Sequence, residues 1–332
     1  MRWVLLAGIG LWGCGFGAGS NNKNNNSDVD GGPNPTPDAM VDAAPPPIDA
    51  PPPPIDAPPV DNDPDRDGVL NPDDNCPVTA NPRQANDDGD ARGDACDTCP
   101  WKANESSEDA DNDHLTDECD PDPRYADQLI YFEGFDKLAT GQTLPQGWTA
   151  RTVSGEWTVS TANGTMTGSH PSAMIQTPSL IGIDLGAGAF TERLYVRATA
   201  QFTDGGNNHR QAGVVGDLDV ASVEGPAGAF CEVTLDQGKS VAGYFRATDT
   251  GEEGNSVGSL ASPVLLRLTV ERRTGGIVQC DAKGVTAGSA NRGDDVMSRA
   301  GTGIGFRVAN GTATFHHVAA FRLNALSKPP SS

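Results

Sequence analysis

Short runs in which apolar and polar residues alternate dominate the chain from about residue 127 onward. This period of two residues is expected of β-strands with one buried face. Turn dipeptides such as Asn163-Gly164 and Asn310-Gly311 separate the runs, and no segment repeats its apolar residues with the period of an amphipathic helix. The predicted strands are Leu129–Phe132, Arg193–Phe202, Ala229–Leu235, Val241–Thr248, Val264–Glu271, Ile277–Cys280 and Thr312–Leu323. The pattern predicts a mostly β chain in which residues 124–326 form an antiparallel β-sandwich, or jelly roll, and residues 327–332 form a tail.

The N-terminus has a hydrophobic pattern of its own. Arg2 supplies a positive charge, and the apolar run from Trp3 to Trp12 is too short to span a bilayer as a helix but is typical of an export signal. The run ends in Leu11-Trp12-Gly13-Cys14, which resembles the bacterial lipobox apart from Trp12, where a small residue is usual. The resemblance implies a lipoprotein signal segment over residues 1–14, lipidation of Cys14, and a location on the cell surface or outer membrane. The alternative is an ordinary secretory signal with a chance cysteine.

Residues 15–60 have no periodic apolar pattern and are rich in asparagine and proline. Their C-terminal part repeats proline runs around Ile-Asp-Ala units. Because proline fixes φ and lacks an amide donor, such a stretch favours polyproline II. We therefore predict a disordered linker over residues 15–60, with a proline-rich part that acts as a semi-rigid spacer.

Negative charge is concentrated in residues 61–123, which we call the acidic segment. It holds 20 acidic and four basic residues in a chain whose net charge is -22. Such a surface repels the phosphates of nucleic acid, which excludes nucleic acid as a partner, and it attracts hard cations. An acidic run can also be a solvated, disordered tail. The regular spacing of its oxygen-bearing residues argues against that alternative.

Three loops in the acidic segment repeat one order of oxygen-bearing residues. Counted from Asp63, Asn86 and Asp109, each loop offers side-chain oxygens or carbonyls at positions 1, 3, 5, 7, 9 and 12, which is the spacing of a calcium loop. Gly68 occupies the sharp-turn position of the first loop, where the other loops carry Ala91 and His114 and are expected to bind more weakly. The predicted calcium ligands, with position 7 acting through its carbonyl, are Asp63, Asp65, Asp67, Val69, Asn71, Asp74, Asn86, Asp88, Asp90, Arg92, Asp94, Asp97, Asp109, Asp111, Asp113, Leu115, Asp117 and Asp120.

The sequences between the loops carry a second signal. Asp74-Asn75-Cys76-Pro77 ends the first loop and Gly93-Asp94-Ala95-Cys96-Asp97 ends the second. The acidic segment therefore resembles thrombospondin type 3 repeats, which implies calcium-loaded loops with little secondary structure and disulfides between sequential cysteines. The spacing agrees, because Cys76 to Cys96 and Cys99 to Cys119 each span 20 residues. Of three possible connectivities we predict these two bonds, and a zinc or redox role for the Cys96–Cys99 pair is the alternative.

The β-rich region carries a weaker resemblance. The stretches FEGFD at Phe132–Asp136, LPQGW at Leu144–Trp148 and AAFRL at Ala319–Leu323 resemble concanavalin-like and laminin-G-like jelly rolls. Folds of this type often bind glycans, and some hydrolyse them. Cys231 and Cys280 lie in two predicted strands, and in an exported domain we predict that they form a disulfide.

Few residues are suited to catalysis or sugar binding. Glu232 and Asp236 bracket a predicted strand end, but the pattern Glu-x-Asp-x-Glu, which places three carboxylates on one strand face, is absent from the sequence. Because His316 and His317 are adjacent, their side chains face opposite sides of a strand, and we expect both at the surface or at a sheet edge. The aromatic residues that could stack on sugars, or belong to the core, are Trp148, Trp157 and Tyr244.

Together these patterns predict a calcium-binding lipoprotein of the cell surface whose β-sandwich serves adhesion or binds a glycan or a surface protein. The predicted partners are Ca²⁺, a membrane reached through the lipid on Cys14, and a ligand of the sandwich. Two alternatives stay open at this point. One is an exported glycan hydrolase with a calcium-stabilised stalk, and the other is a purely structural protein of the envelope.

Overall fold

The computed structural model describes most of the chain after residue 61. The described residues are 62–103, 107–152, 155–170, 178–189, 192–203, 210–219, 228–236, 239–244, 253–256, 263–272, 277–284, 289–295 and 301–328. They belong to one compact unit, Pro59–Ser332. The predicted signal segment, Cys14 and the linker lie outside the described residues.

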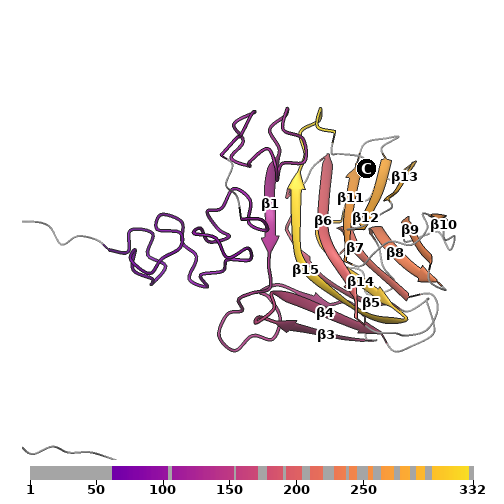
Figure 1. Cartoon of the computed structure of the whole chain (residues 1–332), viewed down its shortest axis with the longest axis horizontal. Coiled ribbons are helices and arrows are strands. Elements are labelled where there is room, and N and C mark those ends of the chain that lie inside the picture. Colours follow the sequence, from indigo (N-terminus) through magenta and orange to yellow (C-terminus); the bar gives the residue numbers. More distant parts are fainter. Residues whose placement is uncertain are drawn as a thin grey trace, which may run out of the picture. The chain divides into compact units, whose positions relative to one another are not determined.

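The β-rich part consists of two sheets in which neighbouring strands are antiparallel (Figure 1). The first has eight strands in the order β13-β12-β11-β6-β15-β4-β3, and β1 pairs with the C-terminal half of β15. Its strands are β1 Gln128–Glu133, β3 Glu156–Ser160, β4 Thr165–His170, β6 Arg193–Phe202, β11 Val264–Glu271, β12 Ile277–Gly284, β13 Ser289–Asp295 and β15 Gly311–Arg322.

The second sheet has seven strands in the order β10-β9-β8-β7-β14-β5-β2. They are β2 Thr149–Ala150, β5 Ser179–Asp184, β7 Arg210–Leu218, β8 Ala229–Asp236, β9 Lys239–Tyr244, β10 Glu253–Ser256 and β14 Gly303–Ala309. No helix occurs among the described residues, and none of them forms a helix long and apolar enough to cross a membrane. The prediction of a mostly β, antiparallel sandwich is confirmed.

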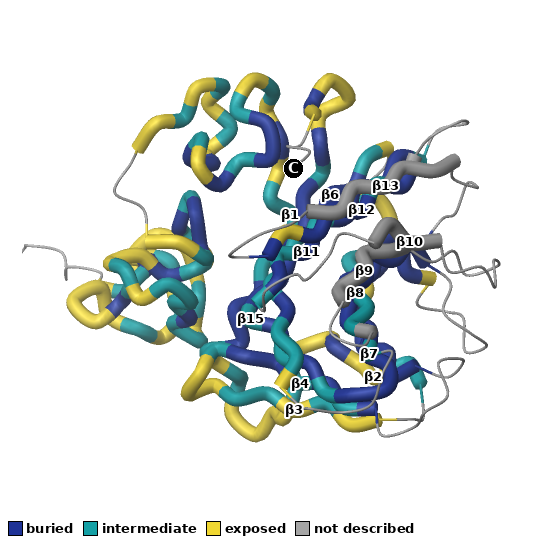
Figure 2. Tube along the Cα trace, turned by 45° about the vertical axis from the view of Figure 1, so that its right-hand side comes forward, coloured by how far each residue is buried: buried dark blue, intermediate teal, exposed yellow. Residues whose placement is uncertain are grey.

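One apolar core fills the space between the two sheets (Figure 2, dark blue). Phe306 of β14 and Phe315 of β15 stack with ring centroids 4.0 Å apart, and Trp148 stacks on Phe306 at 5.4 Å. Each fully buried side chain of this size stabilises the fold by about 1.5–3 kcal/mol. Because Trp148 is 4% exposed, it belongs to the core and is not available to stack on a sugar.

The alternation of apolar and polar residues in the sequence correctly predicted strands that bury one face. β6 and β11 occupy the residues predicted for them. β5 and β7 were not predicted, because nearly every described residue in each is buried and no alternation remains to be read. β13 has the polar sequence SANRGDD, and its pairing with β12 is what makes it a strand.

Three disulfides are present, and they are the three that the sequence predicts. Cys76 is bonded to Cys96, Cys99 to Cys119 and Cys231 to Cys280. The third bond joins β8 of one sheet to β12 of the other inside the core. The first two close loops within the acidic segment, whose described residues form turns and bends without any strand. The disulfides therefore supply part of the stability that a hydrophobic core supplies in other domains.

Candidate metal centres and the junction with the sandwich

Three tight groups of carboxylates lie in the acidic segment. Within each group the potential ligand atoms are all within 4.8 Å of one another. The groups are Asp63, Asp65 and Asp67, then Asp88, Asp90 and Asp97, then Asp109, Asp111 and Asp113. Every group contains positions 3 and 5 of a predicted loop. The first and third groups add position 1, whereas the second adds position 12.

Backbone amides fix the orientation of these carboxylates. In the first loop the amides of Asp67 and Gly68 donate to the two oxygens of Asp63, each at 3.2 Å, and the amide of Val69 donates to Asp67 at 2.7 Å. The third loop repeats the three bonds, from Asp113 and His114 to Asp109 and from Leu115 to Asp113. Such local bonds between side chain and backbone form tight turns without helix or sheet.

The fourth residue of each loop has a left-handed backbone, which turns the chain around the carboxylates. The φ angles are 61° at Arg66, 73° at Gly89 and 63° at Asn112. Position 6 is also left-handed at Gly68 and at His114, with φ of 95° and 77°. Glycine adopts this conformation freely, whereas Arg66 and His114 are strained there. In the second loop Gly89 is left-handed, whereas Ala91 at position 6 does not have a positive φ.

Position 3 of every loop holds a carboxylate with at least one buried oxygen that no described residue satisfies. Oδ2 of Asp65, Oδ2 of Asp88 and both oxygens of Asp111 are buried and have no hydrogen-bond partner among the described residues. Desolvation raises the pKa of all three carboxyl groups, and neighbouring carboxylates raise it further. Leaving such oxygens without a partner is costly, and a hard cation supplies one. Several carboxylate oxygens on a tight loop fit the donor set that Ca²⁺ takes.

The remaining predicted ligands lie outside the three tight groups. Asp74 is 9% exposed, and its Oδ1 accepts bonds from the amide of Cys76 and the side chain of Gln84. The carboxamide of Asn86 bonds within its own loop. The other predicted carboxylates that these groups do not include are Asp94, Asp117 and Asp120, and Asn71 is exposed.

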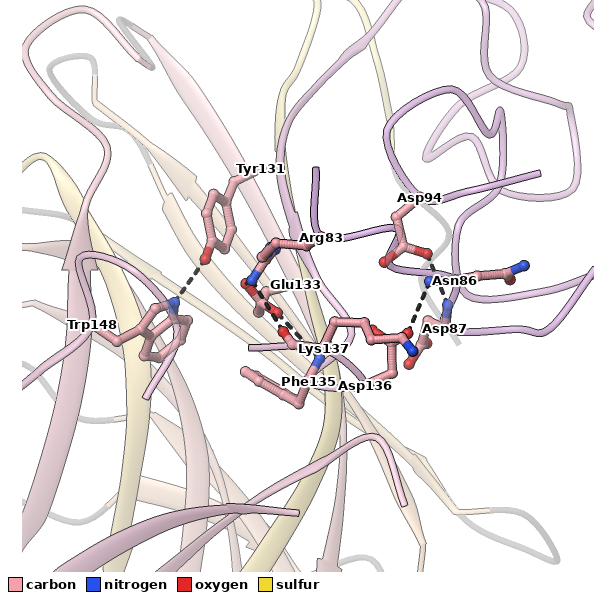
Figure 3. Close-up of polar contacts among 10 residues, drawn as sticks. All are labelled: Arg83, Asn86, Asp87, Asp94, Tyr131, Glu133, Phe135, Asp136, Lys137 and Trp148. Carbon is pink, nitrogen blue, oxygen red and sulfur yellow. Dashed lines mark hydrogen bonds and ion pairs between the residues drawn. The ribbon is translucent and has the colours of Figure 1, made fainter. Parts of the chain in front are cut away.

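A further group of acidic residues lies where the acidic segment meets the sandwich (Figure 3), and of its members the sequence singled out only Asp94, as a calcium ligand. The amide of Asp87 donates to Asp94 at 2.8 Å, and the amide of Asn86 donates to Asp136, just after β1, at 2.9 Å. Burial, followed by the charge of Asp94, raises the pKa of Asp87 to about 8. Burial, with Asp136 nearby, raises the pKa of Asp94 to about 7. Nothing in the loop pattern points to Asp87, because it falls between two ligand positions.

Arg83 forms an ion pair across this junction. Both terminal nitrogens of its guanidinium group lie 3.2 Å from Oε2 of Glu133, the last residue of β1, and one also donates to the carbonyl of Lys137 (Figure 3). Glu133 is 4% exposed, so burial raises the pKa of its carboxyl group while Arg83 lowers it. Arg83 is half-buried, but removing it would leave the charge of the buried Glu133 without this partner, so the pair helps to hold the segment to β1.

Close backbone approach at Gly134 completes the junction. A Cβ atom on Gly134 would lie 2.6 Å from both Cβ and Oδ1 of Asp87. Real Cβ atoms do not approach other atoms so closely, so a side chain at residue 134 would push the second loop away from β1. The glycine in the stretch Phe132–Asp136 therefore serves the contact between the segment and the sandwich.

Trp101 provides the apolar part of the junction. Its ring lies 5.8 Å from Phe132 of β1 and 5.9 Å from Phe321 of β15, measured between centroids. The guanidinium of Arg197, on β6, lies 4.4 Å over the same ring, and His317 stacks on it at 6.0 Å. Three strands of the eight-stranded sheet thus form the surface against which the half-buried Trp101 packs.

The expectation that both histidines lie at the surface or at a sheet edge is wrong for His317. It is 8% exposed and belongs to β15, which has neighbours on both sides. Its Nδ1 lies 3.8 Å from Oδ2 of Asp87. Burial, followed by the charges of Arg197 and His316, lowers the pKa of His317 to about 3, so the ring is neutral. The acidic segment covers this face of β15, which the sequence of the strand alone does not reveal.

A groove of about 780 Å³ lies beside the loop that follows β1. Its lining includes Lys137, Gln142, Trp157 and Thr158. Trp157 is half-buried and stacks on Phe315 at 6.3 Å. Of the aromatic residues proposed for sugar stacking, Trp157 is therefore the one that lines an open groove, and the side chain of Tyr244 lies outside the described residues.

Glu232, one of the two carboxylates considered for catalysis, is fully buried in β8. It forms an ion pair with Arg307 of β14. A general acid of a glycosidase must meet its substrate, and a carboxylate inside the core does not. The side chain of Asp236 lies outside the described residues.

Comparison with known proteins identifies the first loop. The family model of the thrombospondin type 3 repeat matches residues 56–84, which bears out the resemblance over that part of the acidic segment. No curated protein sequence matches the chain.

Among solved structures, the chain is similar to a carbohydrate esterase of the Shiga toxin-encoding bacteriophage phi24B, with 12% identity, 60% of this chain and 100% of that chain covered, and a TM-score of 0.42. It is similar to the carbohydrate binding module CBM66 of Bacillus subtilis, with 16% identity, coverage of 52% and 94%, and a TM-score of 0.34. It is also similar to lectin I-B4 of Griffonia simplicifolia, with 9% identity, coverage of 58% and 99%, and a TM-score of 0.39. At these TM-scores the similarity carries no conclusion about a ligand of this chain.

The buried, neutral His317 makes the junction sensitive to acid. Its folded-state pKa of about 3 lies below the ordinary value of 6.5, so the unfolded chain binds the proton more tightly. The stability that the neutral ring contributes is complete above pH 6.5 and is lost as pH falls from about 6.5 towards about 3. At pH 5 the loss amounts to about 2 kcal/mol, from about 1.4 kcal/mol per pKa unit. Urea unfolding of wild type and His317→Phe at pH 7 and pH 5 measures this difference.

The variant His317→Phe keeps an aromatic ring against Trp101 and removes the titrating group. It should therefore lose less stability between pH 7 and pH 5 than the wild type does. His316→Phe is the matched control with a smaller expected effect, because His316 is only half-buried. The charged and titratable groups that face His317 are Asp87, Arg197 and His316. Equal losses in wild type and His317→Phe would contradict the prediction.

Proposed function

We propose that the acidic segment binds several calcium ions, which hold it in its folded conformation against the sandwich. The observation that carries the proposal is the half-buried aspartate at position 3 of each loop, at Asp65, Asp88 and Asp111, with buried oxygens that no described residue satisfies. Bound calcium would give these oxygens their partner and would offset the repulsion within each group.

Two further features support the proposal. The family model of a calcium-binding repeat type matches the first loop. Among its described residues the acidic segment has few buried apolar side chains, namely Ala85, Leu115, Cys76, Cys99 and Cys119. Its fold therefore depends on cross-links, on docking and on the proposed ions.

Calcium removal tests the proposal on the full chain. With chelator, the carboxylates repel one another, so the acidic segment should expand within the limits set by its two disulfides, while the sandwich keeps its fold. Millimolar calcium should reverse the expansion with an affinity on the order of 10⁻⁴–10⁻³ M, and magnesium should substitute poorly. Small-angle scattering and titration calorimetry measure both effects.

The variant Asp65→Asn should bind fewer ions than the wild type, because it removes a ligand from the first group. Asp184→Asn is the matched control, since Asp184 is an exposed carboxylate at the end of β5, away from the acidic segment. If neither the dimensions nor the heat of titration of the wild type responds to calcium, the proposed function is wrong.

We further propose that the protein is exported and held on the cell surface by a lipid on Cys14. On this proposal residues 1–14 are the signal segment, 15–60 the linker, 61–123 the calcium-binding repeats, 124–326 the sandwich and 327–332 the tail. Three disulfides support export, because such bonds persist in oxidising compartments.

Replacement of the acceptor cysteine tests the anchor. Cys14→Ser should move the protein from the membrane fraction to the soluble fraction and abolish the mass increase of lipidation. Cys231→Ser serves as a control, because it removes a cysteine of the core without touching the signal segment. Unchanged membrane retention of Cys14→Ser would remove the anchor from the proposal.

The sandwich is then the part that the anchor and linker present, and we propose that it serves adhesion by binding a glycan or a surface protein. The groove beside β3 supports this proposal, because it combines the half-buried ring of Trp157 with hydroxyl and amide groups. Rings of this kind stack on sugars while the polar groups fix their orientation.

A glycan array with the full chain tests the glycan branch. Thr158→Arg, an exposed position in the groove, should abolish binding without disturbing the core, whereas Thr149→Arg on β2 should leave binding unchanged. Binding that survives Thr158→Arg would exclude the groove. Cleavage of soluble polysaccharides would favour the exported hydrolase instead.

A further inference from the structure

The groove beside β3 has two walls of unlike construction. One wall is the hairpin of β3 and β4, whose strands are paired with each other. The other wall is residues 136–143, which we call the groove loop. The groove loop contains no strand, and among the described residues one backbone hydrogen bond lies within it, from the amide of Gln142 to the carbonyl of Ala139 at 3.0 Å. The conformation of the groove loop therefore depends on contacts with other parts of the chain.

The acidic segment supplies contacts that hold the start of the groove loop. The amide of Asn86 donates to Oδ2 of Asp136 at 2.9 Å (Figure 3). Nη1 of Arg83 donates to the carbonyl of Lys137 at 3.2 Å. Both donors belong to the second loop or to the residues just before it, so this loop and its approach position one wall of the groove.

The turn of the hairpin wall meets the second loop as well. A Cβ atom on Gly164 would lie 3.4 Å from Oδ1 of Asp87 and 3.8 Å from Cβ of Asp136. The amide of Gly164 donates to the carbonyl of Thr161, within the turn, at 3.4 Å. The second loop therefore lies where the two walls of the groove come together.

Asn86 is fixed by the turn that gathers the carboxylates of the second loop. Its Nδ2 donates to the carbonyl of Asp90 at 2.8 Å, and its Oδ1 accepts the amide of Gly89 at 2.8 Å. Asp88 and Asp90 belong to the second tight group. A change in the spacing of these carboxylates therefore moves Asn86, whose amide is the donor to Asp136.

We propose that the second loop positions the groove loop, so that a ligand binds tightly in the groove only while calcium occupies the second loop. The inference rests on the proposed function and adds the regulation of the groove. Without calcium, repulsion between Asp88 and Asp90 opens the turn and withdraws Asn86 from Asp136. A ligand then has to order the groove loop as it binds, which weakens binding. Because coupling between two sites is reciprocal, a ligand in the groove raises the calcium affinity of the second loop by the same factor.

Hydrogen exchange of the full chain, measured by mass spectrometry with calcium as the only probe, tests this coupling. Calcium should slow exchange of the amides in residues 137–143, including that of Gln142, at least about fivefold in the wild type. Asp88→Asn removes a carboxylate from the second group and should abolish this slowing. Asp111→Asn is the matched control and should keep it, because Asp111 is the equivalent residue of the third loop.

Substitution of Asp136 separates calcium binding from its effect on the groove. Asp136→Ala removes the acceptor of the Asn86 amide but no predicted calcium ligand, so the number of bound ions should stay the same while the slowing is lost. Asp136→Asn keeps an acceptor oxygen and should keep the slowing. A merely structural role of Asp136 would instead change exchange equally with and without calcium. If Asp136→Ala does not fold, Asp88→Asn compared with Asp111→Asn decides the question.

The outcomes separate this inference from the proposed function. A wild-type chain that binds no calcium overturns both. A wild type that binds calcium without any change of exchange in the groove loop overturns the coupling and leaves the calcium-binding loops standing. Equal losses of the slowing in Asp88→Asn and Asp111→Asn also overturn it. Glycan binding that is equally tight with calcium and with chelator would overturn the coupling and leave the groove as a ligand site.

Discussion

Electrostatic repulsion governs this structure. It acts among carboxylates that are crowded into a segment without a hydrophobic core of its own. The three tight groups of the acidic segment bring carboxylate oxygens within 4.8 Å of one another, and the backbone supplies amide donors to only some of them. Like charges so close raise each other's pKa and oppose folding. The conformation of the acidic segment therefore depends on three features that offset this repulsion. They are the two local disulfides, the docking on the sandwich and the proposed ions.

Docking on the sandwich combines three kinds of contact. Trp101 supplies apolar burial and a cation over its ring, Arg83 supplies an ion pair to the buried Glu133, and Gly134 lets the second loop approach β1. The surface that receives them belongs to β1, β6 and β15, which are neighbours in one sheet. The acidic segment is accordingly no free stalk, since its second loop and its only tryptophan are partly buried against the sheet.

The sequence predicted those features that repeat over short distances. The oxygen spacing located all the carboxylates of the tight groups, the 20-residue spacing located two disulfides, and alternation located β6 and β11. It did not predict Asp87, Asp136 or the buried His317, because each acquires its environment from a partner far away in the chain. The sequence did not point to Asp127 for the same reason, since its contacts with Asn324 and Ser327 join the first and last parts of the sandwich's sequence. The residues in and around a strand do not show which of its faces a distant segment will cover.

The return of the chain's end to the start of the sandwich has a mechanical consequence. Asn324 and Ser327 bond to Asp127, the amide of Lys328 bonds to Asp122, and β15 pairs with β1 immediately beside them. A pull on the chain before residue 62 reaches the sandwich first through the docking contacts of the acidic segment, such as the ion pair of Arg83 with Glu133, and reaches β1 through Asp127 only after them. Since Gln128 pairs with Arg322, the start of β1 and the end of β15 lie at the same end of this antiparallel pair. Tension between the two chain ends would therefore separate the strands from that end, one hydrogen bond after another. The bonds of Asn324, Ser327 and Lys328 to Asp127 and Asp122 lie at that end, so they would have to break before β1 and β15 could separate.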